Sequence, residues 1–194
     1  VWSSDLGVPI YLSPDEVKHN GELRIDSGTI EKYNLDPRVS DVITNFFLVK
    51  DFGELYTDDF ELNMQLKNTQ RDGFGGCQDV EIFVLYDNGA IGIPLAKKGC
   101  ISNLRLMAFG SYLDGKKSDL SSFGVSFDDF VPLRCISNSE SFQIFVDNKL
   151  AFEMPSVEEH LSIKGVSVHF QGAGAIKQVA FNNPEGTVYS FPVP

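Results

Sequence analysis

The chain is poor in several residue types that mark whole classes of protein. Its 194 residues include three cysteines, three histidines and one tryptophan, and 27 acidic residues outnumber 16 lysines and arginines. The resulting net charge of −11 argues against a nucleic-acid partner, because phosphate binding needs clustered lysine and arginine. It also argues against binding to an anionic membrane surface. No run approaches the roughly 18 apolar residues that cross a bilayer, so we expect no membrane insertion by this segment.

The cysteines are too few for a disulfide scaffold and lack the spacing of metal ligands. Cys77 and Cys100 flank the strands of one predicted hairpin and could pair, although the sequence does not supply the Cα separation that a disulfide requires. Cys135 lies within an apolar strand and is expected to be a buried thiol. The three histidines are far apart in the sequence and form no metal-binding pair.

Alternating apolar and polar residues are the dominant pattern of the chain. Residues 60–67 alternate strictly, which predicts a half-buried antiparallel strand with one solvated face. Residues 142–146 alternate in the same way, and the following Asp147 and Asn148 tolerate the left-handed backbone of a tight hairpin. Strands at intervals of roughly 8–12 residues are typical of a β-sandwich or barrel. We therefore expect an all-β, two-sheet antiparallel sandwich with a phenylalanine-rich core.

We expect residues 1–194 to form a single domain, with residues 1–57 as the less distinctive N-terminal strands. Capping-box spacings at residues 13–16 and 156–159 predict one or two short helical turns. Residues 101–109 are expected to form a strand. Residues 110–130 form the longest predicted irregular segment, and long loops in compact domains are often functional.

Two segments near the C-terminus carry a family resemblance. Residues 142–150 read FQIFVDNKL, and residues 172–179 read GAGAIKQV. This order of strand, hairpin, return strand and Gly-x-Gly resembles the end of concanavalin A-like lectin/glucanase domains, particularly laminin-G-like jelly rolls. Asn148 replaces the commoner glycine, and Phe130 stands where such domains usually carry tryptophan. The resemblance implies a jelly roll in an extracytoplasmic protein, with carbohydrate as the leading ligand class and calcium often held at the rim.

A pair of acidic residues is the weak candidate for catalysis. Asp79 and Glu81 are two residues apart on one predicted strand and therefore point to the same face. Paired carboxylates perform glycoside hydrolysis. The glucanase branch of the resembling family carries an E-x-D-x-E strand, but here Phe83 occupies the place of a third acid. This departure favours a solvated strand start over a catalytic pair.

Polar residues at the solvent-facing positions of several predicted strands indicate a sugar-binding face. Sugar recognition uses planar hydrogen-bonding groups together with an aromatic platform. The polar residues in this phase are Glu61, Asn63, Gln65, Glu81, Asn103, Arg105, Gln143, His169 and Gln171. Tyr112 would supply the platform from the long loop. The predicted carbohydrate-binding residues are Glu81, Asn103, Arg105, Tyr112, His169 and Gln171. The alternative is that these residues form ordinary solvated faces on two different sheets.

Aspartates crowd the predicted long loop at positions 114, 119, 128 and 129. Oxygen ligands suit calcium, but no spacing here matches a defined calcium loop. Loop aspartates more often stabilise turns. Asp114 and Asp119 are therefore weak metal candidates, and we expect no cofactor unless calcium binds at this rim.

The sequence thus predicts a non-catalytic module that binds carbohydrate and belongs to an extracytoplasmic protein. A first alternative is a structural or protein-interaction domain of a larger surface protein. A glucanase-like glycoside hydrolase is the second alternative.

Overall fold

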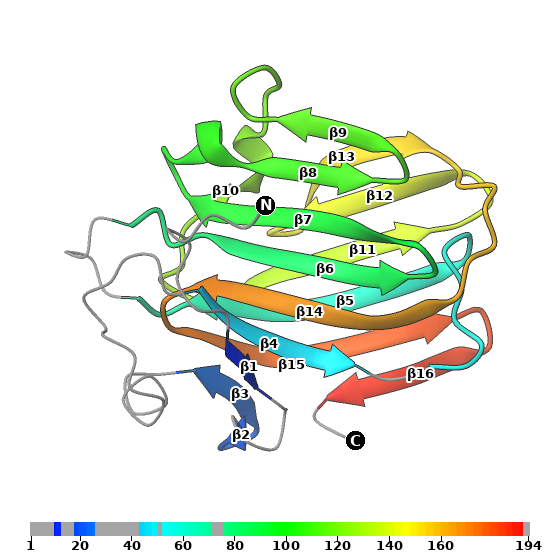
Figure 1. Ribbon diagram of the computed structural model, residues 1–194, viewed down its shortest axis with the longest axis horizontal. Helices are drawn as coiled ribbons and strands as arrows, with labels where there is room; N and C mark the ends of the chain where they lie inside the picture. The colour runs from blue at the N-terminus through cyan, green and yellow to red at the C-terminus, as the bar shows by residue number, and fades with distance from the viewer. Residues whose placement is uncertain (1–9, 13–17, 26–42, 50–51, 71–75, 192–194) are drawn as a thin grey trace.

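The chain folds as two β-sheets packed face to face, as the alternation of the sequence predicts (Figure 1). The computed structural model describes residues 10–12, 18–25, 43–49, 52–70 and 76–191. Within this described part, no helix is long and apolar enough to span a membrane. The predicted helical turn at residues 13–16 lies outside it.

The sheet nearer the viewer in Figure 1 is called the front sheet. Its strand order is β1 (Ile10–Leu12), β4 (Ile43–Val49), β14 (Ile163–Gln171), β6 (Val80–Tyr86), β7 (Gly89–Lys97), β8 (Arg105–Ala108) and β9 (Ser111–Asp114), with β10 (Gly124–Val125) also beside β7. Its strand pairs are antiparallel except for β1 with β4 and β10 with β7. Strand β14 lies between β4 and β6, so segments distant in sequence form the centre of this sheet.

The back sheet lies behind it and is antiparallel throughout its described pairs. Its strand order is β13 (Lys149–Pro155), β12 (Ser141–Val146), β11 (Val131–Ser137), β5 (Phe60–Asn68), β15 (Gly174–Asn183), β3 (Glu22–Ile25) and β2 (Lys18–His19), with β16 (Gly186–Phe191) also beside β15. The predicted hairpin between β12 and β13 is confirmed. Asp147 and Asn148 both have positive φ, 50° and 61°.

The core fills the space between the sheets and is rich in phenylalanine, as predicted. On β5, Leu62, Met64 and Leu66 are at most 1% exposed, whereas the residues between them keep solvent contact. Among the largest fully buried side chains are Phe60, Phe123, Phe142, Phe170 and Phe181. Sheet-on-sheet packing of alternating strands buries one face of each sheet and leaves the other for solvent or ligands.

Three local expectations are corrected by the structure. Residues 156–159 form no helical turn, because Thr57 Oγ1 donates to the Glu159 carbonyl and accepts from the Leu161 N–H. Residues 101–103 form the 3-10 turn η1 (Ile101–Asn103), so the strand begins only at Arg105. The segment 110–130 is not one irregular loop, since it contains β9, β10 and the 3-10 turn η2 (Ser121–Phe123).

Candidate functional site

The outer face of the front sheet brings together most of the predicted site residues. On β6, Val80, Ile82 and Val84 are buried in the core, so Glu81 and Phe83 point outward. Glu81 pairs with His169 of β14 in the cross-strand register. The rings of His169 and Phe83 lie 5.0 Å apart between centroids.

The same face continues across β7 to β8 and β9. Met107 pairs with Gly92 on one side and with Tyr112 on the other, while Leu106 is buried in the core. Met107 is 38% exposed and Tyr112 is 58% exposed. Both values are high for such apolar side chains, so they form an open apolar patch at the edge of the sheet.

Gly92 lets the side chains of the neighbouring strands approach each other over β7. A Cβ placed on it would lie 3.0 Å from Cε1 of Phe83 and 3.4 Å from Cε of Met107. Phe83, Gly92, Met107 and Tyr112 therefore form one continuous row across four strands. The row places an apolar strip beside the polar groups of the face.

One nitrogen of the Arg105 guanidinium, Nη1, is held by neighbouring groups, and the other two nitrogens are left for a ligand. Its Nη1 donates to the carbonyls of Asn103 at 3.0 Å and Leu104 at 2.9 Å, and lies 3.2 Å from Asp114 Oδ1. Within the described part of the chain, its Nε and Nη2 have no protein partner. The fixed Nη1 orients the guanidinium, so the remaining donors are available to a ligand.

The pKa values of two carboxylates at the start of β6 are perturbed: Asp79 directly precedes the strand, and Glu81 is its second residue. Burial raises the pKa of Asp79. Desolvation by nearby protein atoms, followed by the charge of Asp79, raises the pKa of Glu81. Part of the Glu81 side chain nevertheless remains exposed to solvent. Burial lowers the pKa of His169 to about 4, so its imidazole is neutral at pH 7. Ser167 Oγ lies at hydrogen-bond distance, 2.7 Å, from its Nε2. At pH 7 the polar part of the face therefore carries no charge at His169.

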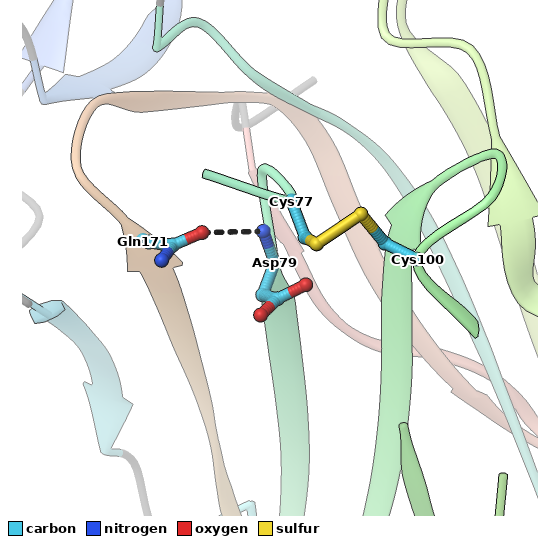
Figure 2. Close-up of a disulfide and its surroundings, with 4 residues drawn as sticks. All are labelled: Cys77, Asp79, Cys100 and Gln171. Carbon is cyan, nitrogen blue, oxygen red and sulfur yellow. Dashed lines mark hydrogen bonds between the residues drawn. A yellow bond between two sulfur atoms is a disulfide. The ribbon is translucent and has the colours of Figure 1, made fainter. Parts of the chain in front are cut away.

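A disulfide lies at the end of the face where β6 begins and β7 ends. Cys77 and Cys100 are bonded with a Cα separation of 5.6 Å, which settles a pairing that the sequence leaves open, and Cys135 is a buried free thiol as predicted. Figure 2 shows the disulfide next to Asp79, whose backbone N–H donates to Gln171 Oε1 at 3.3 Å. Gln171 therefore serves partly to join β14 to the start of β6. Oδ1 of Asp79 is buried and has no hydrogen-bond partner among the described residues.

The predicted metal candidates make local contacts. Asp114 Oδ1 accepts the Lys116 N–H and pairs with Arg105. Asp119 Oδ1 accepts the Ser121 N–H, and its hydrogen bonds to Ser121 lower the pKa of Asp119. In the described ranges, no group of three or more His, Cys, Asp or Glu side chains is arranged to hold a metal. These contacts are typical of turn-stabilising aspartates.

Not every predicted residue joins this face. Asn103 lies in η1 and contributes its backbone carbonyl to Arg105. Glu61, Asn63 and Gln65 lie on β5 and Gln143 lies on β12, so this part of the polar set belongs to the back sheet. Tyr112 lies on the edge strand β9 and not on a loop.

The apolar half of the face, formed by Phe83 and Met107, is absent from the predicted site residues. Met107 is two residues from Arg105, and Phe83 is two residues from Glu81, so each pair points to the same side of its strand. The alternation of the sequence is therefore sufficient to assign Met107 and Phe83 to this face. Phe83 also bears on the catalytic alternative. Phe83 occupies the position at which the glucanase pattern would have a third acidic residue, and its ring packs against His169.

Comparison with known proteins gives no matching family and solved structures of limited similarity. No protein-family model and no curated protein matches the sequence. The Emp47p carbohydrate recognition domain is 15% identical with a TM-score of 0.49, over 93% of this chain and 96% of that chain. Carbohydrate-binding module CBM66 from Bacillus subtilis is 14% identical with a TM-score of 0.43, over 66% of this chain and 77% of that chain. Galectin LEC-6 from Caenorhabditis elegans is 14% identical with a TM-score of 0.37, over 68% of this chain and 88% of that chain.

The names of these three solved structures describe a carbohydrate recognition domain, a carbohydrate-binding module and a galectin. At these identities and TM-scores the comparison assigns neither a family nor a ligand.

Proposed function

We propose that this domain is a non-catalytic carbohydrate-binding module whose site is the outer face of the front sheet. The observation that carries the proposal is the position of Tyr112. Its ring is 58% exposed and lies in the same row as Met107, on the face that also holds Arg105 and Glu81. An exposed aromatic ring beside fixed polar groups suits a sugar, which has an apolar C–H face and a rim of hydroxyls.

Each residue has a distinct role in this proposal. Tyr112 and Met107 pack against the C–H face of a sugar ring. Arg105 donates from Nε and Nη2 to hydroxyl oxygens, and Glu81 accepts from hydroxyl groups. Strands β6 and β8 are separated by one strand, which places their side chains about 10 Å apart. This separation fits a ligand of more than one sugar unit, with His169 and Gln171 at the far end.

The disulfide supports an extracytoplasmic location for the module. Disulfides form and persist mainly in secreted, periplasmic and cell-surface proteins. The Cys77–Cys100 bond joins cysteines that are 23 residues apart in sequence, and such bonds are rare in cytosolic proteins. We accordingly place the domain outside the cytoplasm.

The proposal is tested on an array of glycans and polysaccharides, with and without calcium. We expect saturable binding to at least one saccharide, weakened about tenfold or more in Arg105→Ala, since charge-assisted hydrogen bonds are the stronger ones. The matched control is Arg105→Lys, which keeps the charge but loses the planar fork and should bind at an intermediate level. Loss of binding on calcium removal would add a metal at the rim. An array without any hit would contradict the proposal.

A protein-interaction domain is the second candidate. Tyr112, Met107 and Leu150 are the large hydrophobic side chains that the described residues expose, at 58%, 38% and 47%. Such side chains also occur at protein interfaces. A blank glycan array together with a specific protein partner lost in Tyr112→Ala would favour this function.

The hydrolase alternative rests on Asp79 and Glu81 alone. It requires measurable hydrolysis of β-glucans that disappears in Glu81→Gln. Unchanged glucan after prolonged incubation with the wild type would eliminate it.

A further inference from the structure

A groove of 590 Å³ lies on the opposite side of the sandwich, on the outer face of the back sheet. It crosses β5, β11, β12 and β15, and none of the predicted carbohydrate-binding residues lines it. The side chains that characterise it are Asn63, Gln65, Arg134, Phe145, Gln178 and Asn182.

The strand register builds this groove from cross-strand rows. Arg134 pairs with Phe145 on one side and with Asn63 on the other, and Asn63 pairs with Ala180. Ala180 has a small side chain, so the base of the groove is deeper there than at the larger neighbouring side chains. In the next row Gln65 pairs with Gln178, and Gln65 Nε2 donates to Gln178 Oε1 at 3.5 Å.

The groove is electrically neutral although the protein carries a charge of −11. Arg134 is the one charged side chain in its lining, and the lining contains no carboxylate. Arg134 Nε donates to Glu61 Oε1 at 2.8 Å, and this bond lowers the pKa of Glu61, so the two charges offset each other. A charged ligand would therefore find no opposite charge here, whereas an uncharged polar ligand would meet no repulsion.

The amides keep hydrogen-bonding capacity for such a ligand. Asn63 Nδ2 donates to Glu61, which leaves its Oδ1 as an acceptor. Gln178 accepts through Oε1 from Gln65, which leaves its amide N–H groups as donors. Neither remaining group has a partner among the residues that the structure describes. The Phe145 ring lies 6.0 Å from the Arg134 guanidinium carbon and supplies an apolar surface at the end of the row.

We propose that this groove is a second saccharide site, which takes a neutral oligosaccharide and makes the module bivalent. Adjacent donors, acceptors and an aromatic ring without net charge are the groups that a neutral sugar chain requires. The inference rests on the proposed function for its ligand class, but it uses the other sheet. The two sites face away from each other, so one molecule would link two glycan chains.

The test is isothermal titration calorimetry of the full chain with neutral hexasaccharides of glucose and of mannose. We expect a stoichiometry of two in the wild type. The double variant Asn63→Ala/Gln178→Ala loses two hydrogen-bonding side chains, so its back-sheet site weakens on the order of tenfold to a hundredfold. Gln143→Ala is the matched control. Gln143 lies on the same face of β12 as Phe145, but outside the groove, where it donates to Glu153 Oε1.

The outcomes separate this inference from the proposed function. A stoichiometry of one that the double variant leaves unchanged, and that Arg105→Ala abolishes, overturns the second site and keeps the first. If the double variant weakens binding and Arg105→Ala does not, the back-sheet site is supported and the front-sheet site is overturned. If no hexasaccharide produces heat and none shifts the backbone amide resonances of β5 and β15, the second site is overturned as well.

Discussion

Removal of the Cys77–Cys100 disulfide should destabilise the domain by about 3 kcal/mol. The two cysteines are 23 residues apart in sequence. In the chain-entropy account, a closed loop of that length reduces the entropy of the unfolded state by an amount worth roughly 3.4 kcal/mol at 25 °C. For a chain of this length the loss corresponds to a fall in Tm on the order of 10 °C. The effect acts on the unfolded chain, so the folded structure should stay intact in Cys77→Ala/Cys100→Ala.

Guanidinium unfolding of the wild type and of this double variant, each with and without reductant, measures the effect. The wild type should lose stability on reduction, whereas the double variant should be insensitive to the reductant. Native-state hydrogen exchange should show the loss in the slowest amides of both sheets, because these exchange only through global unfolding. A difference below about 1 kcal/mol between the two proteins would refute the loop-entropy argument for this bond.

Three further predictions concern stability. Phe142→Ala should cost about 3–5 kcal/mol in urea unfolding, because the ring is fully buried and packs edge-on against another phenylalanine ring; a cost below about 1 kcal/mol would contradict the packing. Burial lowers the pKa of His169 from 6.5 to about 4, so its stabilising neutral state is kept above pH 6.5 and lost as the pH falls toward 4. His169→Gln should therefore lose less stability than the wild type between pH 7 and pH 4, and parallel pH profiles would disprove this. Asn148 has a φ of 61°, so Asn148→Val should cost about 1–2 kcal/mol in thermal unfolding while Asn148→Gly stays close to the wild type; equal stability of the two variants would argue against the turn geometry.

The sequence predicts the strands well where alternation is long. β5 and β12 each show a period of two over at least five residues, and each has its apolar set in the core. The Asp147–Asn148 turn was also predictable, because few residues tolerate positive φ. By contrast, β9 has four residues and one neighbouring strand, too short for its alternation to stand out from a polar segment.

The site was only half predictable for a different reason. Alternation tells which residues of one strand share a face, but it does not tell which sheet the strand joins. Residues 61, 63, 65 and 143 therefore looked equivalent to residues 81, 105 and 169, although they lie on opposite sides of the sandwich. The position of β14 between β4 and β6 decides that His169 meets Glu81, and long-range pairing of this kind leaves no local pattern in the sequence.

The most direct test of the central claim is a titration of Tyr112→Ala with the strongest saccharide from the array. Leu150→Ala is the matched control, because Leu150 is also a large exposed hydrophobic residue, at 47%, but lies on the back-sheet edge strand β13. The account predicts that Tyr112→Ala weakens binding about tenfold or more while Leu150→Ala binds like the wild type. Equal affinity of Tyr112→Ala and the wild type would contradict the front face as the saccharide site.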